Sequence, residues 1–200
     1  MGCENSNAIK DSKGSKPNEA RILLVLSHTD YENSFANKEI VNKLMTLIPN
    51  IELDHVDKIY SDSNIDIKKE QDKLVKSDII IFQFPLFWYN APSSLRKWIE
   101  VVFQHGFSHG AKGKSLNGKK LLTSLTTGAP EQSYKEEKDS IENLMHGMEC
   151  LCRLCGMKYL GVVYTFGVSY LLRDKPELLK ERTKDLEKHA QKVADIVKNC

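Results

Sequence analysis

The sequence lacks an apolar run long enough to cross a membrane, and its first twenty residues contain no apolar stretch of the kind that a secretory signal needs. Its basic residues are scattered and the net charge is only +2, so the charged surface of a nucleic-acid-binding protein is missing. Cysteine is scarce, with five in 200 residues, and without a secretory context we expect reduced thiols and a cytoplasmic location. A composition of 40% hydrophobic and 28% charged residues is typical of a globular domain with a sizeable core.

The segment 1–19 is polar and low in β-branched residues, so we expect a flexible arm ahead of a folded domain over 20–200. Gly2 and Ser6 fit the M-G-x-x-x-[ST] pattern of N-myristoylation, and Cys3 stands where a second acyl chain is often added. In a eukaryotic host two acyl chains, helped by the lysines of the arm, would tether the protein to the cytoplasmic face of a membrane. So short a pattern also arises by chance, and an unmodified arm is the alternative.

Short apolar runs alternate with helical patterns along the rest of the chain. We expect strands at 21–27, 50–60, 78–84, 119–128 and 157–168, and helices at 35–48, 66–77, 92–104, 140–155 and 176–198. Strands that alternate with helices form a parallel sheet covered on both faces, here a doubly wound α/β domain. In such domains the ligand lies beyond the carboxyl ends of the strands.

Three of the loops at those ends suit a molecule with a phosphate tail and a flat ring. "SHTDYENSF" after the first strand is rich in hydroxyl and amide groups, and "TTGAPEQSY" after the fourth combines glycine with tyrosine. Ser34 opens the first helix, where free N–H groups and the dipole accept an anion, and its side chain would also cap the helix. The aromatic residues 87–89 after the third strand cannot all enter one core, so we expect them to form a wall for a flat group. Packing in the core is the alternative.

The stretch "QFPLFWYNAPSSLRKWIEVVFQHGFSHG", with "SFANK", "TTG" and "CGM" in their places, resembles the NAD(P)H:quinone oxidoreductases of the flavodoxin-like fold, the group that includes DT-diaphorase. The resemblance covers about residues 21–170. It implies five parallel strands in the order 2-1-3-4-5, a bound flavin, and a homodimer with its sites at the interface. The implied reaction takes hydride from NAD(P)H through flavin N5 to a quinone in a ping-pong cycle. The size of the chain favours FMN over FAD.

The resemblance also implies which residues hold the flavin. The phosphate would lie against His28, Ser34 and Phe35; the isoalloxazine would lie along Pro85, Leu86, Phe87, Trp88 and Tyr89; and Thr126, Thr127, Gly128 and Tyr134 would contact its other edge. Gly128 would let the backbone approach the flavin closely.

The sequence departs from the family pattern in the fourth loop. Ala129 stands where a second glycine is usual, and the histidine that assists hydride transfer in mammalian members has no counterpart, with Ser140 near that spacing. Tyr134 is therefore the candidate catalytic side chain, unless the flavin chemistry needs none. The family pattern further implies that Phe107 and His109 line the quinone site of the neighbouring subunit; for His109, an exposed loop position is an equal alternative.

The cysteines of the segment 140–155 allow a different interpretation. Cys150, Cys152 and Cys155 with His146 suggest a zinc site, but on a helix Cys150 points away from the other two, so buried thiols without a metal are the better account.

Two further functions stay open. One is a flavin-binding regulatory subunit of a membrane transporter, as in the bacterial potassium-efflux relatives. The other is a flavodoxin-like electron carrier, although such carriers are typically acidic.

Overall fold

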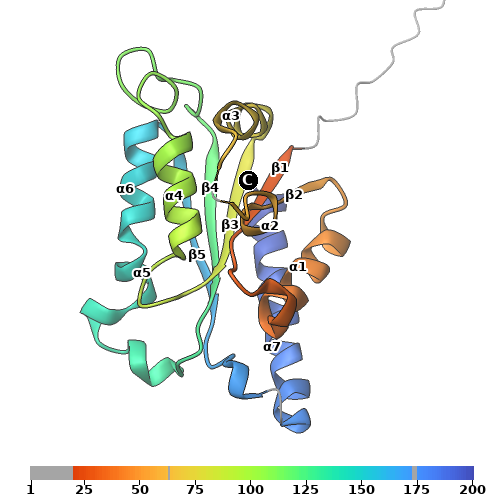
Figure 1. The fold of residues 1–200 in the computed structure, drawn as a ribbon. Coiled ribbons are helices and arrows are strands. Elements are labelled where there is room, and N and C mark those ends of the chain that lie inside the picture. Colours follow the sequence, from red (N-terminus) through yellow and green to blue (C-terminus); the bar gives the residue numbers. More distant parts are fainter. Residues whose placement is uncertain (1–19, 63, 173–174) are drawn as a thin grey trace, which may run out of the picture.

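The computed structural model describes residues 20–62, 64–172 and 175–200 (Figure 1). Its strands are β1 (Ile22–Leu26), β2 (Ile51–His55), β3 (Ile79–Pro85), β4 (Lys120–Thr126) and β5 (Lys158–Thr165). All pairings are parallel, and the order is β2-β1-β3-β4-β5, which confirms the expected flavodoxin-like sheet. The acylation sites predicted at Gly2 and Cys3 lie outside the described residues.

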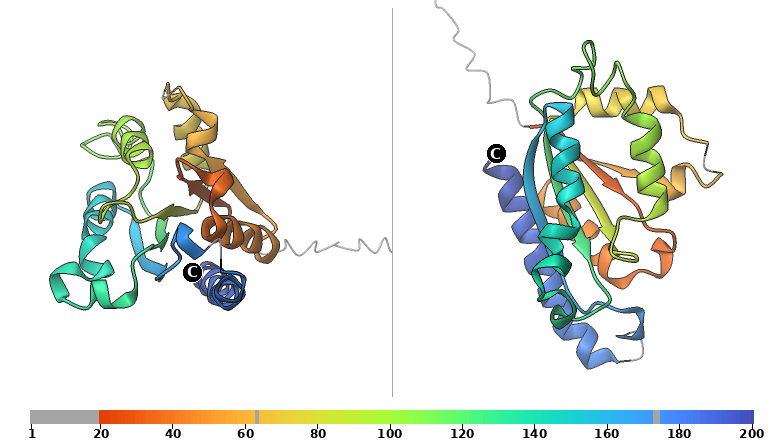
Figure 2. Two further views of the ribbon diagram at one scale, coloured as in Figure 1. Left: turned by 60° about the horizontal axis from the view of Figure 1, so that its bottom comes forward. Right: turned by 90° about the vertical axis from the view of Figure 1, so that its left-hand side faces the viewer.

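Helices cover both faces of this sheet (Figures 1 and 2). The α-helices are α1 (Phe35–Leu47), α2 (Val56–Ile59), α3 (Ile67–Lys76), α4 (Ser93–Val102), α5 (Ile141–Leu144), α6 (His146–Cys155) and α7 (Pro176–Lys198). Short 3-10 helices lie at η1 (Tyr31–Asn33), η2 (Glu131–Tyr134), η3 (Glu137–Asp139) and η4 (Tyr170–Leu172). The helices α1 and α7 pack side by side on one face, and α4 and α6 lie on the other.

Alternation along the strands builds two apolar layers, one under each set of helices. On β3, Ile80 and Phe82 face α4, whereas Ile79 and Ile81 face α1 and α7. Because helices cover both faces of the sheet, every residue of β3 is buried, and buried and exposed residues do not alternate along it. The largest side chain of the α4 layer, Trp98, is fully buried.

Two expected elements differ in the structure. The strand expected at 50–60 ends at His55, and Val56–Ile59 form the helix α2, which turns the buried Val56 into the α4 layer. The helix expected at 140–155 is divided at Met145, whose backbone (φ −93°, ψ 4°) leaves the helical region between α5 and α6. Gly156 ends α6 in the left-handed region (φ +67°), and a Cβ there would lie 1.9 Å from Asn117 Oδ1, so glycine is strongly favoured at this position.

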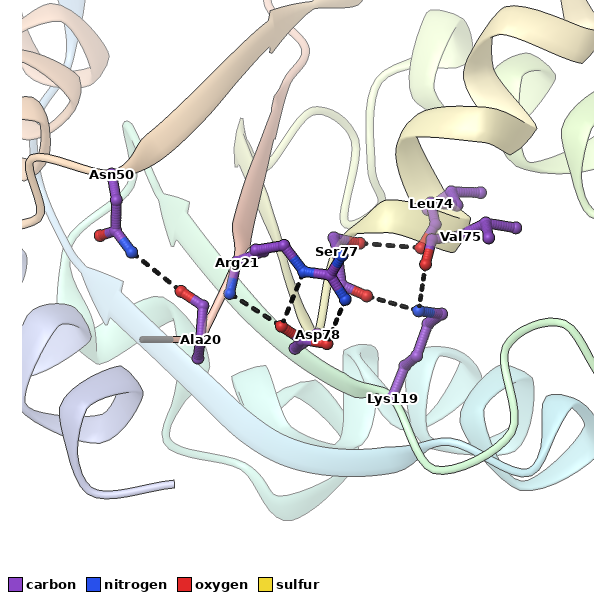
Figure 3. A network of polar contacts seen from close by, with 8 residues as sticks. All are labelled: Ala20, Arg21, Asn50, Leu74, Val75, Ser77, Asp78 and Lys119. Atoms are coloured by element: carbon purple, nitrogen blue, oxygen red, sulfur yellow. Dashed lines mark hydrogen bonds and ion pairs between the residues drawn. The ribbon is translucent and has the colours of Figure 1, made fainter. Parts of the chain in front are cut away.

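Polar contacts tie the amino-terminal edge of the sheet together (Figure 3). Asp78, at the start of β3, accepts hydrogen bonds from the backbone N–H of Arg21 at 2.9 Å and from its guanidinium at 3.1 and 3.2 Å. Lys119, just before β4, donates to the carbonyl oxygens of Val75 and Ser77 at the end of α3. These contacts link the starts of β1 and β3 to each other and the start of β4 to the end of α3. In the part of the chain that the structure describes, no helix is both long and apolar enough to cross a membrane.

Candidate functional site

The carboxyl ends of the strands point to the lower part of Figure 1. A cavity of about 630 Å³ opens at this edge of the sheet. It is lined by the loops after β1, β3 and β4, by the start of α1 and by the segment after β5. Of the residues predicted to bind the flavin, it brings together His28, Ser34, Phe35, Pro85, Leu86, Phe87, Trp88, Tyr89, Thr126, Gly128 and Tyr134. Their roles stay predictions, but their convergence on one cavity is a property of the fold.

The amino-terminal end of α1 forms one end of this cavity. Ser34 has an extended backbone, and its Oγ accepts a hydrogen bond from the N–H of Asn37 at 3.3 Å, so Ser34 is the N-cap that the sequence predicts. The first N–H groups of an α-helix have no acceptor within the helix, and the dipole adds positive potential there. Ser34 and the first turn of α1 therefore have the chemistry that suits an anionic group.

His28 stands beside that helix end with a defined tautomer. Its backbone N–H donates to Asp57 Oδ2 at 2.8 Å, and its Nδ1 accepts a hydrogen bond from the N–H of Asp30 at 3.1 Å. Burial lowers the pKa of His28, which favours the neutral ring. In that ring the proton is on Nε2, so His28 can donate one hydrogen bond to a group in the cavity.

The aromatic wall is a tight turn whose two central residues have an unusual backbone. Phe87 and Asn90 exchange two backbone hydrogen bonds of 3.0 Å, and Trp88 and Tyr89 between them have φ angles of 51° and 61°. Such a turn favours Asn-Gly, and left-handed backbone costs other residues about 1–2 kcal/mol each. The residues Phe87, Trp88 and Tyr89 are 39%, 95% and 57% exposed, so the alternative that they fill the core does not hold.

Tyr134 extends this wall from the other side of the cavity. Its ring stacks on Phe166 at 5.3 Å between centroids and meets the edge of Tyr89 at 6.3 Å. Burial raises the pKa of Tyr134, so its hydroxyl keeps its proton at neutral pH and can act as a donor.

The loop after β4 differs in part from its predicted role. Thr126 lines the cavity, but Thr127 does not, because its N–H donates to Thr165 O at 2.9 Å and its Oγ1 donates to Ala129 O at 2.7 Å. Thr127 therefore shapes the loop. A Cβ added to Gly128 would meet only Ser169, at 3.8 Å, which is an ordinary contact. Within this chain, neither backbone angle nor crowding requires glycine at 128.

Phe107 and His109 lie elsewhere. They belong to the loop between α4 and β4, at the amino-terminal edge of the sheet, and they do not line the cavity of their own chain. His109 Nδ1 lies 2.9 Å from Ser108 Oγ, and its ring meets that of His105 at 5.6 Å. Their role at the site of a neighbouring subunit stays a prediction.

Sequence reasoning missed several cavity residues. Asn37, buried in α1, lies three residues after the N-cap, and its amide on an otherwise apolar helix face was a signal that could have found it. Ser169 and Leu179 come from the segment after β5 and from α7, and no local pattern marks them.

The cysteines of α6 form no part of this cavity. Cys152 and Cys155 are buried, and burial raises the pKa of the Cys152 thiol to about 12. Cys150 is partly exposed and contacts His146 Nε2 at 3.3 Å. Among the residues that the structure describes, no group of three or more His, Cys, Asp or Glu side chains is placed to hold a metal ion.

Fold and site together define a flavodoxin-like protein whose cavity joins the amino-terminal end of α1 to three exposed aromatic residues. The family model described as "Flavodoxin-like fold" matches residues 20–190. The chain is 34% identical over 143 residues to the uncharacterized NAD(P)H oxidoreductase YdeQ of Bacillus subtilis (strain 168), covering 70% of this chain and 72% of that protein. It is 33% identical over 140 residues to KefF of Enterobacter sp. (strain 638), the ancillary protein of a glutathione-regulated potassium-efflux system, covering 70% of this chain and 79% of KefF.

A solved structure has the same fold. The general stress protein 14 of Treponema denticola, crystallised in complex with FMN, superposes with a TM-score of 0.79 at 21% identity, covering 88% of this chain and 99% of that protein. The chain belongs to the NAD(P)H:quinone oxidoreductase family of the flavodoxin-like fold.

Proposed function

We propose that this protein binds FMN in the cavity at the carboxyl edge and catalyses the reduction of quinones, or of similar two-electron acceptors, by NAD(P)H. One observation carries the proposal: a single cavity joins the start of α1, which suits a phosphate, to the exposed aromatic turn 87–89, which suits a flat ring. The FMN in the structurally similar general stress protein 14 and the name of YdeQ support it.

The residues of the cavity fit the parts of FMN. Ser34 and the first N–H groups of α1 would hold the phosphate, and the neutral His28 would add a hydrogen bond from Nε2. Phe87, Trp88 and Tyr89 would cover the ring and exclude water from it. FMN is preferred to FAD because the sequence shows no dedicated adenine pocket.

Bound FMN would supply the redox chemistry, accepting a hydride equivalent from NAD(P)H and passing two electrons to the quinone. The protein orients the two substrates, which would occupy the same face in turn, and keeps that face dry. Tyr134 would offer its hydroxyl proton at the edge of the ring. Phe107 and His109 of a second copy of the chain would complete the quinone site, so we propose a homodimer.

The purified protein tests the proposal directly. We expect flavin absorption bands, release of FMN rather than FAD on denaturation, loss of the bands with anaerobic NADPH, and their recovery when a quinone is added. Steady-state rates with varied NADPH and quinone should give the parallel double-reciprocal lines of a ping-pong cycle. A colourless protein that binds neither FMN nor FAD would exclude the proposal.

The likeness to KefF favours a second candidate, a flavin-binding regulatory subunit of a membrane transporter. Acylation at Gly2 and Cys3 would suit that role, and the mass of the amino-terminal peptide from a eukaryotic host tests it. Quinone turnover as fast without a membrane partner as with one would favour the enzyme. A protein that binds FMN but turns over no NAD(P)H would favour the regulatory subunit.

A further inference from the structure

A row of buried polar side chains crosses the layer between the sheet and the helices α1 and α7. Asn37 Nδ2 donates to Ser34 Oγ at 3.3 Å and to Thr126 Oγ1 at 3.2 Å, and Gln83 Nε2 donates to Asn37 Oδ1 at 2.8 Å. The row continues from Gln83 through Ser124 on β4 and His189 on α7 to Thr165 at the end of β5. Its inner members are 0–4% exposed, so these hydrogen bonds are largely shielded from water.

With the side-chain amides of Asn37 and Gln83 oriented as they are in this structure, the hydrogen bonds of the row all run in one direction. Ser124 Oγ donates its only proton to Gln83 Oε1 at 2.5 Å, so in its 2.7 Å contact with His189 Nε2 it can only accept. His189 therefore carries its proton on Nε2. Burial and the nearby Lys192 lower the pKa of His189 to about 3, which keeps the ring neutral and leaves Nδ1 to accept from the Thr165 hydroxyl at 2.9 Å.

The direction of these hydrogen bonds decides whether the hydroxyl groups that line the cavity can donate to a ligand. Ser34 and Thr126 both line the cavity, and both use their oxygen atoms to accept from Asn37. Their own protons are then left to donate to a group in the cavity. If the side-chain amide of Asn37 were rotated by 180°, its oxygen would face the hydroxyls of Ser34 and Thr126. The amide of Gln83 would then have to rotate as well to keep its hydrogen bond with Asn37. The orientation is therefore a property of the whole row.

We propose that the row from Thr165 to Asn37 presents the hydroxyls of Ser34 and Thr126 as donors to acceptor oxygens of the bound FMN, and that His189 is a remote positioning residue for this site. The inference rests on the proposed FMN binding. His189 lies on α7 and outside the lining of the FMN cavity, so it acts only through Ser124, Gln83 and Asn37.

Three variants of α7 test the row by the dissociation constant of FMN, measured by fluorescence titration of the FMN-free protein. His189→Leu breaks the row and should raise the constant about tenfold, whereas His189→Gln, which can donate to Ser124 and accept from Thr165, should stay within twofold of the wild type. Leu186→Ala, also fully buried on α7, is the matched control for lost packing and should stay within twofold as well. Equal affinity of His189→Leu and the wild type, or an equal loss in Leu186→Ala, would overturn the inference.

A measurement on the unaltered protein needs no variant to fold. The ¹⁵N spectrum of the FMN-bound wild type should show His189 with its proton on Nε2, and a proton on Nδ1 would overturn the inference. Failure of the wild type to bind FMN would instead refute the proposed function, so the two failures are distinguishable.

Discussion

Phe87 and Asn90 exchange both of their backbone hydrogen bonds, at 3.0 Å each, across a turn in which Trp88 and Tyr89 both have positive φ angles. A turn of this geometry in most proteins carries Asn or Gly at its centre. Here two large aromatic residues occupy it despite the strain, and their exposed side chains lie at the mouth of the cavity. Strain of this kind concentrates at functional sites, where surrounding structure maintains it.

Trp88→Asn should therefore change the stability of the protein and its affinity for FMN in opposite directions. Asparagine tolerates the left-handed backbone, and the indole is 95% exposed, so the free energy of unfolding of the FMN-free protein should rise by about 1 kcal/mol. The affinity for FMN should fall about tenfold through the lost ring contact. Denaturant melts and fluorescence titration measure the two effects. Trp88→Phe keeps both the ring and the strain, and should leave both quantities near those of the wild type.

Ser34→Ala should weaken both the helix and the phosphate contact. Loss of the N-cap should lower the free energy of unfolding by about 1 kcal/mol, and loss of the hydroxyl donor should raise the FMN dissociation constant about tenfold. Asp66 caps α3 by accepting from the N–H of Lys69 at 3.0 Å and does not line the cavity. Asp66→Ala is therefore the matched control, with a similar loss of stability and unchanged affinity. A similar loss of affinity in both variants would contradict a role for Ser34 at the phosphate.

Tyr134→Phe tests the candidate catalytic hydroxyl. The ring contacts with Phe166 and Tyr89 remain, so FMN affinity should be kept, while kcat for quinone reduction should fall about tenfold because one hydrogen-bond donor is lost. Tyr134→Ala should lower both the affinity for FMN and kcat. A kcat unchanged in Tyr134→Phe would show that the flavin chemistry needs no side-chain acid here.

The buried carboxyls of Asp54 and Glu70, which share Lys73 at 2.7 and 2.6 Å, predict a pH dependence of stability. Burial, with Glu70 nearby, raises the pKa of Asp54 from 3.8 to about 7. Between these values the folded protein binds a proton that the unfolded chain does not, so the contribution of Asp54 to stability falls as pH rises through this window. The pKa of Glu70 is lowered from 4.5, and its contribution is lost only at lower pH.

The measurement compares the wild type with Asp54→Asn from pH 4.5 to 8. The free energy of unfolding of the wild type should fall relative to that of Asp54→Asn up to about pH 7. Above that pH the two curves should run parallel. The comparison matters because buried His189, with its lowered pKa, makes both proteins more stable as pH rises over part of the same range. Parallel curves over the whole range would refute the raised pKa of Asp54.

Local patterns predicted much of the fold but not where two elements end. The strand pattern continued past His55 because Val56 and the residues around it alternate weakly, and four residues are too few for a helical period to show. The helical pattern likewise ran through Met145, because the apolar positions of α5 and α6 stay nearly in phase. Packing of Val56 into the α4 layer and the turn at Met145 are decided by neighbours that the local sequence does not contain.

The alternation of apolar runs with amphipathic helices was enough to predict the parallel sheet, and local patterns also predicted the helix cap at Ser34 and the exposed aromatic residues 87–89. The polar row behind the cavity could not be predicted in this way, because its members are far apart in the chain. Gln83 stands 46 residues from Asn37 and 41 from Ser124, and Ser124 stands 65 from His189. Local periodicity tells which face of an element a side chain occupies. The register of β3 against β4, which pairs Gln83 with Ser124, and the packing of α1 and α7 over them decide which partner it meets.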